Sequence, residues 1–282
     1  MAKNRGSFLS NVWHGAGYRA RKLLSSNGSK IGLSRYKAWK LKHLPYNSPH
    51  TYDLKGTTIH FNNGPELLHS LKEIFIDEVY RIPFKTSTPY IIDCGANIGL
   101  AILYITRQYP QARIVAFEPD SANFFFLQKN IQSNQLTNVE LRKEAVWNAD
   151  TTLQFASEGT LGSRINQDGG GTDTIAVKAT RLKNLLTRPI DFLKMDIEGA
   201  EYEVLKDCAD SLHLVDFLFI EFHGYFNRMH ELTEILQIVQ SNQFAYYIRE
   251  AAAVYPTPFY RSNAPKYQYD IQLNIFCFKN HS

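Results

Sequence analysis

Residues 90–120 carry the pattern that most constrains the fold of this 282-residue chain. Residues 90–92 are a short apolar run, which is typical of a buried parallel strand. The run leads into a turn at 93–99, D-C-G-A-N-I-G, after which apolar residues recur at helical spacing. A second strand at 114–117 ends in Glu118. The stretch therefore predicts a strand–helix–strand unit with parallel strands and a glycine-containing turn.

The composition of this unit indicates the ligand that it binds. Glu118 lies nineteen residues past Gly99, where an acid in a βαβ unit accepts hydrogen bonds from both hydroxyls of a ribose. Dinucleotide sites begin this turn with glycine, because backbone N–H groups there face a pyrophosphate. Asp93 stands in that place, and a carboxylate repels a pyrophosphate but suits an ammonium or a sulfonium group. S-adenosylmethionine carries both, so we predict it as the cofactor; an ordinary glycine turn is the alternative.

Ligands of an open parallel sheet bind at the carboxyl ends of its strands. A third strand is predicted at 139–146, and Glu144 within it can accept from the exocyclic amine of adenine while the next N–H reads a ring nitrogen. A solvated carboxylate at a strand end is the alternative for this residue. The predicted cofactor-binding residues are Asp93, Gly95, Ala96, Asn97, Gly99, Glu118, Pro119, Glu144, Ala145 and Asp196.

Two further strand ends carry the candidates for catalysis, which are Asp196, His223 and Glu198. The two acids follow a fourth strand at 190–195, and their alternate spacing places both on one side of the pleat. An acid beside a helix N-terminus is the alternative for Glu198. His223 follows a fifth strand at 215–222, and imidazole titrates near neutral pH, as a general base must. A merely hydrogen-bonded histidine is its alternative. Carboxylates with histidine also suit a divalent metal, but the linear spacing forms no dedicated motif and we predict none.

The charge of the chain is unevenly distributed along its length. Residues 1–50 hold ten Lys and Arg and no acid, whereas the other 21 basic and 27 acidic residues give the remainder a net charge of −6. A basic arm can bind nucleic acid or provide a peripheral contact with an anionic membrane; a solvated extension is the alternative. There is no apolar run of 18 residues and no secretory signal, so we expect a cytoplasmic protein. The three cysteines lie far apart in apolar contexts and are predicted to be reduced.

The remaining segments add helices and strands before, within and after this central unit. The predicted elements are helices at 12–24, 33–41, 66–81 and 232–239, a strand or hairpin at 51–61, an inserted hairpin from strands at 153–156 and 174–179, and an antiparallel pair at 245–248 and 271–278. The glycine-rich tip of the inserted hairpin is a usual place for a substrate lid or for a plain flexible loop.

The motifs D-C-G-A-N-I-G, F-E-P-D, E-A-V, L-K-M-D-I-E-G-A-E and I-E-F-H, between residues 90 and 223, resemble those of the FkbM-type S-adenosylmethionine-dependent methyltransferases. The resemblance implies the class I methyltransferase fold, a Rossmann-like α/β sheet of seven strands in the order 3-2-1-4-5-7-6 with strand 7 antiparallel. It also implies O-methylation of hydroxyls on sugars or secondary metabolites. The family residues match at Asp93, Gly95, Asn97 and Gly99 in the cofactor loop, at Glu118 for the ribose, and at Asp196, Glu198 and Glu201 in the fourth-strand signature. The family's frequent L-D-x-L element is Leu-Lys-Asn-Leu at 182–185 here.

These observations predict a basic N-terminal extension at 1–62 and an S-adenosylmethionine-binding methyltransferase domain at 63–282. The expected partner is a small-molecule or glycan hydroxyl acceptor. Two other functions stay open, namely an RNA methyltransferase that uses the basic arm and a non-catalytic cofactor-binding partner of a glycan-assembly complex. Nucleic acid is the less favoured substrate, because the chain has neither an N-P-P-Y nor a D-P-P-Y tetrapeptide and no RNA-binding module.

Overall fold

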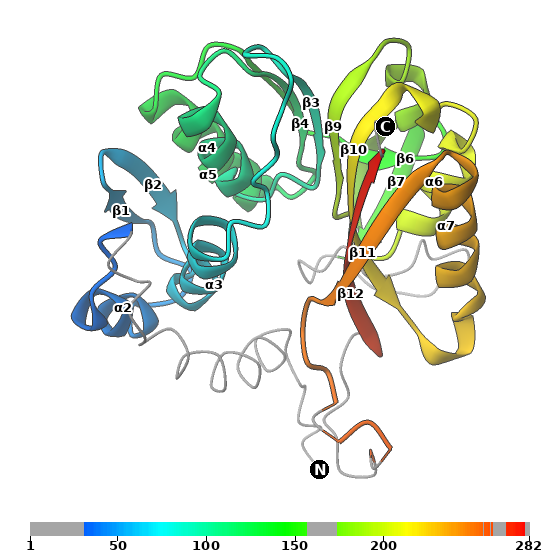
Figure 1. Cartoon of the computed structure of the whole chain (residues 1–282). Helices are drawn as coiled ribbons and strands as arrows, with labels where there is room; N and C mark the ends of the chain where they lie inside the picture. The colour runs from blue at the N-terminus through cyan, green and yellow to red at the C-terminus, as the bar shows by residue number, and fades with distance from the viewer. Residues whose placement is uncertain (1–30, 157–173, 256, 260, 262–268, 280–282) are drawn as a thin grey trace.

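The computed structural model describes residues 31–156, 174–255, 257–259, 261 and 269–279. Its centre is a seven-stranded sheet in the order β11-β12-β10-β9-β3-β4-β5 (Figure 1). Counted along the chain and read from β5, these strands stand in the order 3-2-1-4-5-7-6. The last strand, β12, runs antiparallel to both of its neighbours, whereas the pairs from β10 to β5 are all parallel. The predicted α/β class is therefore confirmed.

The elements of the central unit follow the order that the sequence predicts. The sheet strands are β3 (Tyr90–Cys94), β4 (Arg113–Phe117), β5 (Val139–Arg142), β9 (Ile190–Met195), β10 (Val215–Gly224), β11 (Phe244–Glu250) and β12 (Ile271–Lys279). The main helices between them are α4 (Leu100–Gln108), α5 (Ser121–Ser133), α6 (Glu201–Cys208) and α7 (His230–Ser241), with short helical turns η3 (Leu182–Leu185), η4 (Leu212–Leu214) and η5 (Phe226–Arg228).

Helices cover both faces of the sheet, because its strands are apolar on both sides. Ile91 of β3 packs in the cluster that contains α4 and α5, whereas Ile92 packs in the cluster that contains α6 and α7. Figure 1 shows the sheet between these two helical layers. The three-layer arrangement leaves the carboxyl ends of the parallel strands as the edge where a ligand can enter.

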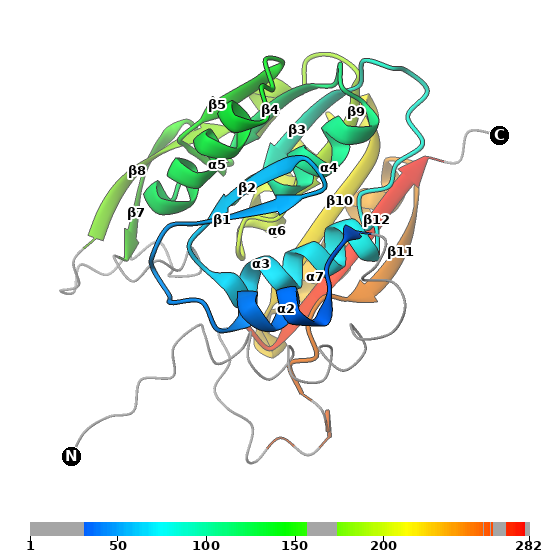
Figure 2. The same cartoon turned by 90° about the vertical axis from the view of Figure 1, so that its left-hand side faces the viewer.

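The N-terminal elements lie on the same side as α4 and α5, as Figure 2 shows. They are α2 (Arg35–Lys42), the hairpin of β1 (His50–Leu54) and β2 (Thr57–Phe61), α3 (Gly64–Ser70) and the π-helical turn η2 (Leu71–Ile76). The helix predicted at 66–81 is too long, since Glu78 has a φ of 52°, in the left-handed region, which a continuing right-handed helix does not allow. The predicted boundary at residue 62 stays a prediction, although the hairpin before it packs on the rest of the chain.

The third predicted strand, 139–146, is wrong in its extent. It divides into β5 in the main sheet and β6 (Ala145–Trp147) in a second, three-stranded sheet of order β6-β8-β7. In that small sheet β7 (Thr151–Ala156) and β8 (Thr174–Arg181) form the predicted inserted hairpin. The tip of the hairpin and the helix predicted at 12–24 lie outside the described residues. Within the described part of the chain, no helix is long and apolar enough to cross a membrane.

Asn130 of α5 joins three segments that are distant in sequence. Its side chain accepts from the backbone N–H of His60 at 2.6 Å and donates to the carbonyls of His60 at 3.0 Å and Ile98 at 2.8 Å. The residue is fully buried, and so is its hydrogen bond to the Ile98 carbonyl. Asn130 thus fixes the N-terminal hairpin and the end of the β3–α4 turn to α5.

We expect Asn130→Ala to lower the free energy of unfolding by about 1–3 kcal/mol, because it leaves buried backbone groups without partners. Equilibrium urea denaturation measures the change. The matched control is Gln132→Ala, an exposed position on the same helix, which should change stability by no more than about 0.5 kcal/mol. Equal effects of the two substitutions would contradict the assignment.

Candidate active site

A cavity of about 250 Å³ lies at the carboxyl ends of β3, β9 and β10. One wall comes from α3 and η2 and another from residues 251–254 and Tyr269 of the C-terminal segment. Six of the predicted site residues line it, namely Gly95, Ala96, Asn97, Asp196, Glu198 and His223. The others are not among its lining residues, namely Asp93, Gly99, Glu118, Pro119, Glu144 and Ala145.

The β3–α4 turn requires glycine for steric reasons. Gly95 has a φ of +83°, and a Cβ there would lie 1.8 Å from the carbonyl oxygen of Asp196. The backbone N–H groups of Gly95 and Ala96 donate to the carbonyl of Phe117 at 3.1 and 2.8 Å, which joins the turn to the end of β4. Asn97, with a φ of 50°, donates from its side chain to Glu66 of α3 at 3.1 Å. The turn is therefore held from the sheet below and from α3.

Glu118 is anchored by backbone groups. One carboxylate oxygen accepts from the N–H of Asn97 at 2.8 Å and the other from the N–H of Asp120 at 2.9 Å. The side chain is buried, and this burial raises the pKa of Glu118 to about 7, although the two hydrogen bonds lower it. Its contact with a ribose stays a prediction, since the structure shows it binding the turn itself.

Asp93 forms a buried ion pair that sequence reasoning missed. Its carboxylate lies 3.2 Å from Nζ of Lys194, which also donates to the carbonyl of Gly95 at 2.7 Å. Burial alone would lower the pKa of Lys194, but Asp93 and Asp196 raise it well above its ordinary value, so the ammonium is charged. The signal in the sequence was a lone lysine inside the apolar strand I-D-F-L-K-M. The predicted direct contact of Asp93 with the cofactor stays a prediction.

His223 lies at the centre of a group of carboxylates. Its Nδ1 is 3.1 Å from Oε1 of Glu201, and its Nε2 is 3.7 Å from carboxylate oxygens of both Glu198 and Glu221. Only 2% of the side chain is exposed. Burial lowers the pKa of His223, but Glu198 and Glu201 raise it, and the net pKa is well above the ordinary value. With these partners alone the imidazole is a cation at neutral pH, so it is a poor acceptor for another proton.

The loop after β9 is held in an unusual backbone conformation. Glu198 and Gly199 have φ values of 57° and 99°, both in the left-handed region. Glu201 accepts from the N–H groups of Ile197 at 3.1 Å and Gly199 at 3.0 Å, and the hydroxyl of Tyr269 donates to the carbonyl of Glu198 at 2.6 Å. Sequence reasoning missed the contact from Tyr269, because 71 residues separate the partners.

Glu144 and Ala145 belong to the small sheet in this structure. The Glu144 carboxylate accepts from Nζ of Lys178 at 2.6 Å and from the hydroxyl of Thr180, both on β8. Ala145 is buried at the start of β6. Their contacts with adenine stay predictions.

The similarity to known proteins is concentrated on this part of the chain. Residues 93–246 match the family model described as the methyltransferase FkbM domain. Methyltransferase 1 of Beauveria bassiana is 31% identical over an alignment that covers 55% of this chain and 72% of that protein. Methyltransferase sdnD of Sordaria araneosa is 34% identical, covering 48% of this chain and 66% of that protein, just under two thirds.

Similarity to a solved structure is weaker. The crystal structure of methyltransferase FkbM from Methylobacillus flagellatus is 16% identical with a TM-score of 0.46, and the match covers 70% of this chain and 45% of that one. The fold is defined by the strand order described above.

The burial of Glu118 predicts a pH effect on the ligand-free protein. A carboxyl whose pKa is 4.5 when unfolded and about 7 when folded contributes about 3 kcal/mol of stability, complete below pH 4.5 and lost as the pH rises through 7. We therefore expect wild type to lose about 3 kcal/mol relative to Glu118→Gln between pH 4 and pH 8. Urea denaturation of both proteins at each pH measures the difference, and parallel pH profiles would refute it.

Proposed function

Since the chain belongs to the FkbM methyltransferase family, we propose that it transfers a methyl group to a hydroxyl oxygen of a sugar, a glycan or a secondary metabolite. The methyl donor of the family is S-adenosylmethionine. The observation that carries the proposal is the position of Asp196, Glu198 and His223, which line the same cavity as the β3–α4 turn. The candidate catalytic residues and the turn proposed to bind the cofactor therefore face the same cavity.

The residues of the turn fit this cofactor. Gly95 lacks the Cβ that would block the approach of a ligand to the backbone, and the carboxylates of Asp196 and Glu198 face a cavity where a sulfonium charge is favourable. Glu118 would accept from the ribose with the lone pairs that its two backbone donors leave unused. When bound, the cofactor supplies an electrophilic methyl carbon with a neutral thioether as leaving group.

The lining of the cavity favours an uncharged acceptor. Five carboxylates line it, whereas Lys194 is the one lysine or arginine among the described lining residues; the acids are Glu66, Glu73, Asp196, Glu198 and Glu221. Such a surface repels the phosphates of a nucleic acid, whose binding depends on lysine and arginine. A hydroxyl of a small neutral molecule meets no such repulsion. This supports a sugar or metabolite acceptor over RNA.

A carboxylate is the better candidate for the proton acceptor. His223 is cationic among its three carboxylate neighbours, so it contributes a positive charge to the site and not a proton acceptor. Asp196 or Glu198 then takes the hydroxyl proton. The site then aligns the acceptor oxygen with the methyl group, which is the main contribution that such a displacement needs.

The cofactor assignment predicts selective stabilisation. S-adenosylhomocysteine at a hundredfold excess over its dissociation constant should raise the free energy of unfolding by about 2.7 kcal/mol, and NAD⁺ should not. Glu118→Ala should lose this response, whereas Glu140→Ala, an exposed acid on β5, should keep it. Thermal unfolding measures each case. A response to NAD⁺ alone would mean that the turn binds a dinucleotide.

The proton-acceptor assignment predicts that Asp196→Asn or Glu198→Gln lowers kcat by about 10²- to 10⁴-fold. Transfer of labelled methyl from S-adenosylmethionine to a panel of sugars, phenols and hydroxy acids measures turnover. Asp216→Asn, near the other end of β10, is the matched control and should keep it. Full turnover of both site variants would exclude these carboxylates as the base.

A further inference from the structure

We propose that Asp196, Glu221 and His223 bind one divalent cation at the acceptor side of the cavity. The sequence predicts no metal because these residues form no linear motif, and the site becomes visible only where β9 and β10 lie side by side. The existence of the site is independent of the proposed function, but its role in activating a hydroxyl rests on that function.

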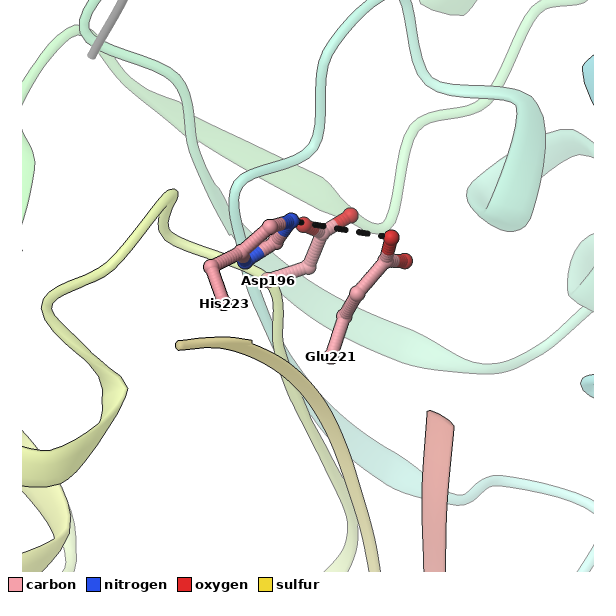
Figure 3. A group of neighbouring side chains, drawn as sticks. All are labelled: Asp196, Glu221 and His223. Carbon is pink, nitrogen blue, oxygen red and sulfur yellow. Dashed lines mark ion pairs between the residues drawn. The ribbon is translucent and has the colours of Figure 1, made fainter. Parts of the chain in front are cut away.

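The three side chains converge on one small volume. Glu221 and His223 alternate along β10 and therefore face the same side of the sheet. Asp196 follows Met195, which pairs with Ile220 in the parallel register of β9 and β10, so Asp196 lies next to Glu221. Figure 3 shows the side chains pointing toward one another.

The spacing of the ligand atoms suits a single ion. One donor atom from each residue lies within 4.8 Å of the other two. Donors on opposite sides of an ion with bonds of about 2.1 Å lie about 4.2 Å apart, so small side-chain rotations close the site.

His223 provides an independent observation that points to a ligand. Its Nδ1 faces Glu201, a buried carboxylate that two backbone N–H groups hold in place. This arrangement fixes the ring and directs Nε2 into the cluster. Nε2 lies 3.7 Å from Glu198 and Glu221, which is longer than a hydrogen bond. This nitrogen has no hydrogen bond among the described residues, although only 2% of the side chain is exposed. A carboxylate on one ring nitrogen, with the other nitrogen directed at carboxylates, is the usual surrounding of a metal-binding histidine.

The carboxylates that line the cavity also favour the binding of a cation. Its five lining carboxylates face two cationic side chains, Lys194 and His223, and Lys194 is shared between Asp93 outside the lining at 3.2 Å and Asp196 at 3.4 Å. The Glu221 carboxylate has no hydrogen bond among the described residues; His223 lies 3.7 Å away, and the Asp196 carboxylate belongs to the same small group. A divalent ion would supply two positive charges where the carboxylates of Asp196 and Glu221 converge.

The donor set indicates the class of ion and its use. Carboxylate oxygens suit Mg²⁺ and Mn²⁺, and imidazole suits Zn²⁺ and Fe²⁺, so a mixed site fits Mn²⁺ as a probe. A cation there would lower the pKa of an acceptor hydroxyl. The proton then passes to Glu198, which is not a ligand. The acceptor oxygen forms its bond to the methyl carbon as the carbon–sulfur bond breaks, and that electron pair stays on sulfur.

The test is Mn²⁺ binding to the full chain after removal of metals with EDTA, measured by calorimetry and by the loss of the free-ion electron paramagnetic resonance signal. We expect one ion per chain, no measurable binding to Glu221→Gln or Asp196→Asn, and 10- to 100-fold weaker binding to Glu201→Gln, which removes the carboxylate that orients His223 but none of the three ligands. The control Glu140→Gln should bind as wild type does. Circular dichroism of each variant verifies that it is folded.

The outcomes separate the metal site from the methyl transfer. Absence of Mn²⁺ binding to wild type, or binding that folded Glu221→Gln retains, overturns the metal site, even if methyl transfer proceeds in EDTA. Stoichiometric binding that Glu221→Gln abolishes supports the site, even if no hydroxyl acceptor is methylated. If the chain both binds Mn²⁺ and transfers methyl groups, EDTA should lower kcat for hydroxyl acceptors and added Mn²⁺ should restore it.

Discussion

The ion pair between Lys194 and Asp93 determines how the centre of this site is built. The two residues stand opposite each other on adjacent central strands, β9 and β3. The same ammonium reaches the carbonyl of Gly95 and so holds the turn that follows β3. Removing one partner of a buried pair leaves an uncompensated charge, which costs more than the pair contributes. The turn and the first residue after β9, Asp196, therefore keep one relative position.

A second set of contacts transmits this position to β10. The close approach of Gly95 to the Asp196 carbonyl fixes where the loop after β9 begins. Within that loop the left-handed residues Glu198 and Gly199 turn the chain so that Glu201 opens α6 with its carboxylate beneath His223. An unfavourable conformation of a residue other than glycine persists only where surrounding contacts determine it. Here the hydroxyl of Tyr269 supplies one of those contacts.

The sequence was sufficient for features that are local. The turn at 93–99, the acid after β4 and the strands on either side follow from periodicity and residue type, and the sheet order followed from the family resemblance. The sequence was insufficient where a feature depends on contacts between residues that are distant along the chain. The alternation of V-E-L-R-K-E-A-V does not show that the chain leaves the sheet at 143–144, because the cause is a contact with β8. The raised pKa of His223 depends on Glu198 and Glu201. The metal-binding role proposed for Glu221 depends on Asp196, which follows the neighbouring strand.

The acidic cavity poses a problem for methyl transfer that the cations of the site address. Carboxylates near a sulfonium stabilise a charge that the reaction removes, so they would favour the bound substrate over the transition state. Lys194 and His223 offset this effect from within the protein, because each lies within 4 Å of carboxylates that line the cavity. A divalent cation bound by Asp196, Glu221 and His223 would take the place of the proton on His223 and bring two positive charges to the acceptor side. The carboxylates of the lining would then attract the positively charged cofactor. The cations would limit this attraction, so that it opposes less strongly the conversion of the sulfonium to a neutral thioether.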